Sequence, residues 1–365
     1  MAYSVDLLDT PFVAIDLEIV ERNLTRMQEK ASNLGLGLRP HTKTHKQPIL
    51  ARRQLELGAT SITVAKLDEA EAMLAAGLDD MLIAYPLVGE AKAHRLAMLM
   101  KRGLKPTVSI DSHAAMETLA LAGRLAERDV DVLVEVDTGF HRCGITGPQV
   151  LALAQAIHNT AGVRLRGLMS YAGHIPGNTD PDVIIRLIQE EDALLAQYAE
   201  ELRAHQLPVD IISVGGTILS HHMEHIHTAT EVRPGIYVYN DIGIVAAGAA
   251  AIEECAGRVW ATVVSQPAPE RLVLDAGSKM LSTDGPIRGA YGHVVEHPDW
   301  RIARLSEEHA VVELPLGAGP VNIGERVSII PNHICTSMNL QSSVVALRQG
   351  QVVETRPIMA RGGTR

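Results

Sequence analysis

The chain has the size and composition of a soluble globular protein with more than one folded region. It contains 365 residues, 46% of them hydrophobic and 21% charged, a length that suits two domains or one barrel with an addition. The net charge of −10 argues against nucleic acid as a partner, and no apolar run reaches the length of a membrane span. The first residues lack the features of a signal peptide, and three cysteines are too few for a disulfide framework, so we expect a cytoplasmic protein.

The first two thirds of the chain alternate between strand-like and helical patterns. An apolar run at 10–17 predicts a strand, and residues 18–34 form an amphipathic helical pattern. Eight further strands are then expected, with helices between most of them, which predicts a (β/α)8 TIM barrel; the alternative is an open doubly wound sheet. The strands are expected at 36–40, 61–66, 80–85, 105–111, 130–137, 164–171, 210–215 and 231–238, and the helices at 48–58, 68–77, 89–102, 113–128, 147–158 and 181–205.

The pattern changes after about residue 250. Short β-branched runs, separated by glycine or proline, predict a mostly-β domain with little helix. We therefore divide the chain into a barrel at 1–248, whose first strand is free to join the β-domain, and a β-domain at 249–365. The runs lie at 258–265, 271–274, 310–313, 326–330, 343–347 and 351–355.

A basic segment, Arg-Pro-His-Thr-Lys-Thr-His-Lys at 39–46, follows the second predicted strand. If the segment is extended, His41, Lys43 and His45 share one face, because residues two apart in a strand point the same way. Neighbouring cations favour the neutral, nucleophilic form of an amine, which suits Lys43 to Schiff-base chemistry. The alternative interpretation is a solvated basic loop, and the octet by itself does not decide between the two.

Other polar residues gather at the carboxyl ends of the predicted strands, where barrel enzymes place their active sites. Gly215-Gly216-Thr217 and the Arg233-Pro234-Gly235-Ile236 turn follow neighbouring strands and could bind an anion through backbone N–H groups, although each could also be a tight turn. Arg142 could contact a phenolate or carboxylate. Alternatively, it could form a salt bridge with Glu135 or Asp137.

The β-domain contains one pair of metal-ligand residue types. His333 and Cys335 would project together from an extended chain, and imidazole with thiolate is a zinc-type pair whose shell water or substrate would complete. The alternative is that the cysteine is simply a small buried residue. A second histidine-rich segment is interpreted as a polar loop or short helix rather than a metal site. It contains His221, His222, His225 and His227.

Six motifs then occur in one order along nearly the whole chain. This ordered set resembles the alanine-racemase-like (fold type III) pyridoxal-phosphate proteins, and most closely their D-threonine aldolase and D-serine dehydratase group. The resemblance implies the same barrel and β-domain, a pyridoxal 5'-phosphate cofactor, and a homodimer with its sites near the subunit interface. The motifs are RPHTKTHK at 39–46, EVDTGFHRCG at 135–144, SYAGH at 170–174, GGT at 215–217, LDAG at 274–277 and PNHIC at 331–335.

The resemblance also implies roles for individual residues. Lys43 would bind the cofactor and act as the catalytic base, Arg142 would contact the phenolate oxygen of the cofactor ring, and Tyr171 would pack or hydrogen-bond near that ring. Arg233 would hydrogen-bond the pyridine nitrogen, keeping it unprotonated and weakening the electron sink. The remaining residues would hold the phosphate (Gly216, Thr217, Gly235 and Ile236) and a divalent metal (His333 and Cys335), expected to be zinc, with manganese or magnesium as alternatives.

Two departures from the aldolases favour elimination over carbon–carbon cleavage. The aldolases usually have His-x-Asp where this chain has His333-Ile334-Cys335, and a second histidine where this chain has Gly177, with His174 as the nearest imidazole. The resemblance thus implies a lyase of the D-serine or D-3-hydroxyaspartate dehydratase type, which releases a 2-oxo acid and ammonia. The alternatives are aldol cleavage to glycine and an aldehyde, an amino-acid racemase with Tyr291 as second base, and a non-catalytic cofactor carrier.

Overall fold

The structure, a computed structural model, describes residues 3–175 and 177–365 and divides them into two compact units. One unit, the barrel unit, comprises 26–43, 48–235 and 363–365. The other, the β-unit, comprises the residues up to Thr25, 44–47 and 236–362. One of the points at which the chain passes from one unit to the other is the peptide bond between Lys43 and Thr44. In the part of the chain that the structure describes, no helix is long and apolar enough to cross a membrane.

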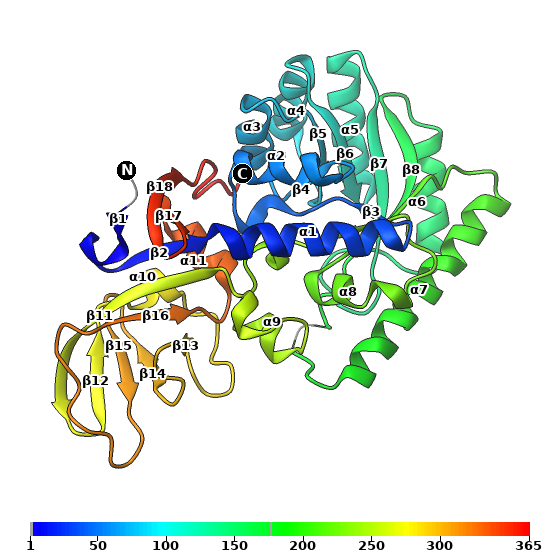
Figure 1. Cartoon of the computed structure of the whole chain (residues 1–365). Helices are drawn as coiled ribbons and strands as arrows, with labels where there is room; N and C mark the ends of the chain where they lie inside the picture. Colours follow the sequence, from blue (N-terminus) through cyan, green and yellow to red (C-terminus); the bar gives the residue numbers. More distant parts are fainter. Residues whose placement is uncertain (1–2, 176) are drawn as a thin grey trace. The chain divides into compact units, whose positions relative to one another are not determined.

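The barrel unit contains an eight-stranded sheet in which every pairing is parallel (Figure 1). The sheet closes between its end strands, where Thr60 N donates to Leu38 O and Thr63 N to Pro40 O, each at 2.8 Å. The predicted barrel is therefore confirmed and the open sheet is excluded. In sheet order the strands are β3 (Gly37–Leu38), β10 (Glu231–Arg233), β9 (Ile211–Gly215), β8 (Val163–Ser170), β7 (Val130–Val136), β6 (Lys105–Ile110), β5 (Asp80–Ile83) and β4 (Ile62–Val64).

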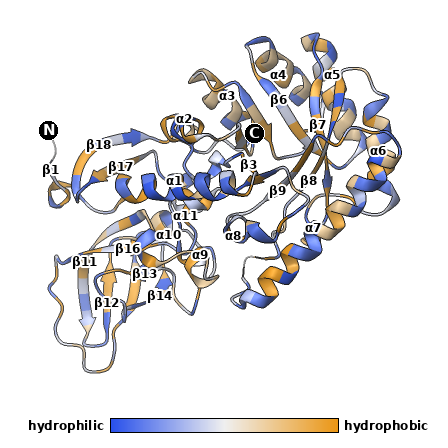
Figure 2. Ribbon diagram, turned by 45° about the vertical axis from the view of Figure 1, so that its right-hand side comes forward, coloured by the Kyte–Doolittle hydropathy of each residue, from blue (hydrophilic) through white to orange (hydrophobic). Residues whose placement is uncertain are grey.

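The predicted helices of this unit are also present, each within a few residues of its expected ends. The longest, α7 (Pro181–Ala204), begins where Asp180 accepts a hydrogen bond from Asp182 N and where Pro181 occupies the first turn. Most buried residues of α7 recur every three to four positions, and the helix carries both polar and apolar residues (Figure 2). This pattern is expected for a helix that packs one face against a sheet. The other helices are α2 (Pro48–Leu57), α3 (Leu67–Ala75), α4 (Glu90–Lys101), α5 (His113–Ala126), α6 (Pro148–His158) and α8 (Thr217–His221); α1 (Leu17–Asn33) precedes them.

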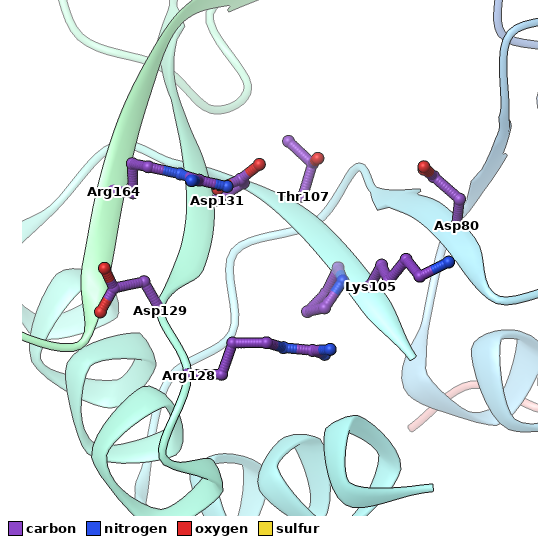
Figure 3. Close-up of a pocket in the computed structure, with 8 residues that line it drawn as sticks. Asp80, Lys105, Thr107, Arg128, Asp129, Asp131 and Arg164 are labelled. Carbon is purple, nitrogen blue, oxygen red and sulfur yellow. The ribbon is translucent and has the colours of Figure 1, made fainter. Parts of the chain in front are cut away.

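The amino ends of the barrel strands surround a hollow of about 370 Å³ whose charges largely neutralise one another (Figure 3). Asp131 lies 2.7 Å from both Arg164 and Arg166, and Lys105 lies 2.8 Å from Asp79. Such paired charges suit the stabilising face of a barrel, whereas the opposite rim carries the reactive side chains. The hollow is lined by Asp80, Lys105, Pro106, Thr107, Arg128, Asp129, Asp131 and Arg164.

The β-unit contains a ten-stranded sheet that includes the N-terminal strand β2 (Phe12–Asp16). β2 pairs in parallel with β17 (Ser343–Arg348) and antiparallel with β11 (Gly257–Ala268), and the pairing of β11 with β16 (Arg326–Ile330) closes part of the sheet on itself. The mostly-β prediction is thus confirmed. The other strands are β1 (Tyr3–Ser4), β12 (Arg271–Leu274), β13 (His293–Val294), β14 (Arg301–Leu305), β15 (Ala310–Glu313) and β18 (Gln351–Pro357).

Candidate functional site

The basic segment that carries Lys43 is a buried turn and not a strand. Residues Thr42–Thr44 form one turn of 3-10 helix after β3, and Thr42, Thr44 and His45 are fully buried. Thr42 Oγ1 donates to Thr63 O, so side-chain hydrogen bonds hold the turn in place of a strand ladder. Both expectations for this segment are therefore wrong, the shared strand face of His41, Lys43 and His45 and the solvated loop.

Two predicted cofactor residues, Lys43 and Arg142, lie near the ring of a third, Tyr171, which directly follows β8. Lys43 Nζ lies 5.9 Å from the ring centroid, and the Arg142 guanidinium lies 4.8 Å from it. Phe140 packs edge-on against the same ring, with the centroids 5.7 Å apart. Lys43 and Arg142 follow β3 and β7, so the carboxyl rim of the barrel brings them together as the barrel rule predicts.

The carboxylates proposed as alternative partners of Arg142 are engaged elsewhere. Glu135 accepts a hydrogen bond from Ser109 Oγ at 3.1 Å, and burial raises the pKa of its carboxyl group. Asp137 lies 2.8 Å from His141 Nδ1 and also accepts from the backbone N–H groups of Gly139 and His141. The Arg142 guanidinium instead lies over the Tyr171 ring and forms a hydrogen bond with the Cys143 side chain.

The two predicted phosphate loops lie next to each other beside Tyr171. Gly235 N donates to Thr217 Oγ1 at 3.3 Å, and Ile236 begins the following 3-10 turn, Ile236–Val238. A Cβ atom on Gly215 would lie 2.7 Å from Arg233 Nη2 and 3.3 Å from a Tyr171 ring carbon, and Gly216 has a φ of +114°. Glycine is thus required at both positions, and these loops present backbone rather than side chains next to Tyr171.

Arg233 lies in the barrel interior and is fixed by two hydrogen bonds. Its Nη1 donates to Ser213 Oγ and its Nη2 to Ser170 O, each at 2.6 Å. Burial lowers the pKa of the guanidinium to about 10, while the carboxylates of Glu231, Glu135 and Glu191 act in the opposite direction. The side chain therefore stays cationic at neutral pH.

This charged interior was not predicted from the sequence. Glu231 also binds Arg39 Nε at 2.9 Å, so two arginines and several carboxylates share one buried network. The signal that could have revealed it is a charged residue in the carboxyl-terminal half of a mostly apolar strand, as at Glu135 in β7.

Glu191 gives this network a testable pH dependence. Burial raises the pKa of its carboxyl group from 4.5 to about 7, although Ser170 Oγ donates a hydrogen bond to it. A raised pKa in the folded state means that stability is fully present below the unfolded pKa and is lost as the pH rises through the folded one. We expect Glu191→Gln to lack this loss, so its stability relative to wild type should rise by about 3 kcal/mol from pH 4.5 to pH 8.

Denaturant unfolding at several pH values measures this difference. The matched control is Glu190→Gln, because Glu190 lies on the exposed face of the same helix in an ion pair with Arg186. Parallel pH profiles for wild type and Glu191→Gln would show that Glu191 is ionised in the folded protein.

In the β-unit, His333 and Cys335 lie at the start of a helix and not in an extended segment. His333 caps α11 (Ile334–Leu340), and Cys335 occupies its first turn. The buried carboxylate of Asp241 explains the change, because it accepts hydrogen bonds from Ile334 N and Ile244 N at 3.0 Å and fixes the entry to the helix. The expectation of an extended pair is wrong, but the two side chains still interact.

The side chains around His333 favour a positive charge between the two candidate ligands. Burial opposes that charge, but the hydrogen bond and charge of Cys335, followed by Asp241 and Asp284, raise the pKa of His333 to about 10. A metal ion could replace this proton, since imidazole and thiolate are both zinc ligands. Cys335 Sγ also lies 3.1 Å from Thr44 Oγ1, and Thr44 follows Lys43 directly in the chain.

The pair of His333 and Cys335 is consistent with a metal ion that keeps coordination positions open for water or substrate. Across residues 3–175 and 177–365, no group of three or more histidine, cysteine, aspartate or glutamate side chains is arranged to hold a metal ion. A site made of His333 and Cys335 would therefore need water or substrate to complete its shell, as in catalytic sites. Among the 221–227 histidines, His221 ends α8 and His225 ends the 3-10 turn Met223–His225, which agrees with the short helix expected for part of this segment.

Two family models match the chain, one over each part of it. "Alanine racemase, N-terminal domain" matches residues 15–242, and "Putative serine dehydratase domain" matches residues 256–347. The chain is 34% identical to a D-threonine aldolase from Arthrobacter sp. over 362 residues, which cover 98% of this chain and 94% of the relative. It is 35% identical to a D-threo-3-hydroxyaspartate dehydratase from Delftia sp. over 353 residues, which cover 90% of this chain and 92% of the relative.

A solved structure supports the same grouping. It is a cysteine-to-alanine variant of D-threo-3-hydroxyaspartate dehydratase in the metal-free form, and it matches with a TM-score of 0.90 and 32% identity. The match covers 97% of this chain and 98% of that one.

Proposed function

Because the chain belongs to the D-threonine aldolase and D-serine dehydratase group of the alanine-racemase-like pyridoxal-phosphate lyases, we propose that it eliminates the β-hydroxyl group of a D-3-hydroxy amino acid with the help of a divalent metal. D-Serine and D-3-hydroxyaspartate are the proposed substrates. The products would be a 2-oxo acid and ammonia. The observation that carries the proposal is the interaction of the His333 ring with the Cys335 side chain at the start of α11, which brings two zinc-type ligand residues together.

The residues of the carboxyl rim fit pyridoxal phosphate. When bound, the cofactor withdraws electrons from the Cα atom of an amino acid. Lys43 would anchor it, Tyr171 would pack against its ring, and Arg142, whose guanidinium lies beside Tyr171, would bind its phenolate oxygen. Arg233, buried and cationic, is the proposed partner of the pyridine nitrogen. The phosphate would be held by the loops that lack side chains next to Tyr171, through Gly216, Thr217, Gly235 and Ile236.

The chain's own groups divide the chemistry between a base and a metal pair. Lys43 Nζ would accept the proton from the substrate Cα atom. His333 and Cys335 would hold the metal, expected to be zinc, which as a Lewis acid would help the β-hydroxyl group to leave. Loss of water gives an enamine that hydrolyses to the 2-oxo acid and ammonia.

The aldolase reaction is the second candidate, since one of the relatives is a D-threonine aldolase. It would break the Cα–Cβ bond and give glycine and an aldehyde. Cys335 in place of an aspartate, and Gly177 in place of a second histidine, favour elimination. The racemase and carrier readings have less support. The first needs a second base such as Tyr291, and the second leaves the His333–Cys335 pair without a role.

Product analysis separates these reactions. Purified, zinc-loaded protein is incubated with D-serine, D-threonine or D-3-hydroxyaspartate, and 2-oxo acid, ammonia, glycine and aldehyde are each measured. We expect a 2-oxo acid and ammonia in equal amounts from D-serine or D-3-hydroxyaspartate. Glycine with an aldehyde as the main products would contradict elimination. A homodimer and a cytoplasmic location also remain proposals, which sedimentation and cell fractionation would test.

A further inference from the structure

His333 has two ring nitrogens, and one of them is already bonded. Its Nδ1 lies 2.7 Å from Asp284 Oδ2. Asp284 is 49 residues away in sequence, in the segment that follows the short helix α10 (Ser278–Leu281). As long as this hydrogen bond is kept, Nε2 is the ring nitrogen that remains to bind a metal.

We propose that Asp284 is a positioning residue for the metal pair, which fixes the tautomer and orientation of His333 so that Nε2 is the metal ligand. This inference rests on the proposed function, because it assigns a partner to a residue of the proposed metal site. A carboxylate that accepts the Nδ1 proton leaves Nε2 as the lone-pair nitrogen and makes the ring a stronger donor. Asp284 does not itself need to touch the metal or the substrate.

The carboxylate is held in place by its own neighbours. Thr336, in the first turn of α11, has its Oγ1 3.0 Å from Asp284 Oδ2 and 2.9 Å from His333 O. Ser282 Oγ lies 3.1 Å from the same threonine hydroxyl and accepts from Asp284 N at 3.2 Å. The carboxylate is thus bonded to the histidine ring and to the helix that carries Cys335, and the backbone N–H of Asp284 is bonded within its own turn. This is the arrangement expected of a residue that orients a ligand.

A simple surface ion pair is the alternative explanation of the contact. The side chains of His333 and Asp284 are 41% and 46% exposed, and ion pairs with that exposure contribute little to stability. The two explanations differ in what they predict for metal binding. Removal of a simple surface ion pair has little effect on metal binding, whereas loss of a residue that orients a metal ligand weakens metal binding about 10–100-fold.

The test measures zinc affinity by competition with a chromophoric chelator for wild type, Asp284→Ala, Asp284→Asn and His333→Ala. We expect Asp284→Ala to bind zinc about 10–100-fold more weakly than wild type. Asp284→Asn should recover part of this loss, because its side-chain carbonyl can still accept the Nδ1 proton. The control is Glu354→Ala, which removes a carboxylate from the exposed pair with Arg356 in the same unit and should leave zinc affinity unchanged.

The outcomes separate this inference from the proposed function. If wild type and His333→Ala bind zinc equally weakly, the proposed metal site at His333 and Cys335 is wrong, and the role inferred for Asp284 is wrong with it. If His333→Ala loses zinc but Asp284→Ala keeps wild-type affinity, the inference is wrong while the proposed function stands. A fall in the unfolding midpoint of metal-free Asp284→Ala, with no recovery of zinc affinity in Asp284→Asn, would make Asp284 a structural residue and would also overturn the inference.

Discussion

Replacing Lys43 with alanine is expected to abolish both the visible absorbance of the lysine-bound cofactor and all lyase activity. Lys43 Nζ is the amine that lies 5.9 Å from the Tyr171 ring, at the rim where Arg142 and the glycine loops also meet. In the proposed mechanism the variant would lose both the covalent anchor and the base that takes the Cα proton, and general-base catalysis alone is typically worth about 10²–10⁴-fold. Absorbance spectroscopy and the product assay measure the two losses separately.

The matched control for this variant is Lys105→Ala. Lys105 lies at the amino end of β6, in an exposed ion pair with Asp79 on the opposite rim of the barrel. We expect wild-type absorbance and activity for the control. If the yellow species survives in Lys43→Ala after dialysis, another amine carries the cofactor and the assignment of Lys43 is wrong.

Replacing Cys335 with alanine is expected to remove the metal and the lyase activity while the cofactor stays bound. In the proposed site Cys335 is one of two protein ligands, so its loss would leave His333 alone, which is too few donors for tight binding. Lewis-acid catalysis is worth several kcal/mol, so activity should fall by about a thousandfold or more. Metal analysis, cofactor absorbance and the product assay are run on the same sample.

Cys255→Ala is the control, because burial raises the pKa of the Cys255 thiol to about 12 and so keeps it protonated. A protonated, buried thiol is a poor metal ligand. We expect this variant to keep metal and activity, with some loss of stability from the cavity that it leaves. Full activity of Cys335→Ala without bound metal would contradict the Lewis-acid role.

The sequence predicted the architecture well because the barrel depends on patterns that repeat along the chain. Strands such as β7 are mostly apolar and buried, and helices such as α7 carry one apolar stripe, so the hydrophobic pattern reveals both. Three strands of the β-unit were missed. β1 and β13 are each two residues long, and β14 (Arg-Ile-Ala-Arg-Leu) has two arginines among five residues, which also fits an exposed loop.

The candidate site residues were chosen from motifs, and the local conformations of two of their segments differ from those expected. The turn at Thr42–Thr44 depends on a hydrogen bond to Thr63, and the helix at His333 depends on the carboxylate of Asp241. Asp284 was missed for the same reason, because no local pattern connects it with a histidine 49 positions later. Contacts between residues far apart in sequence are what periodicity and spacing cannot supply.

The most direct test of the account is release of 2-oxo acid and ammonia by the zinc-loaded protein before and after chelation. D-Serine and D-3-hydroxyaspartate are each assayed, with the cofactor absorbance recorded throughout. We predict that chelation stops product release, leaves the cofactor bound, and is reversed by added zinc. Undiminished release from the metal-free protein would contradict the role of His333 and Cys335, and release of glycine with an aldehyde would contradict elimination itself.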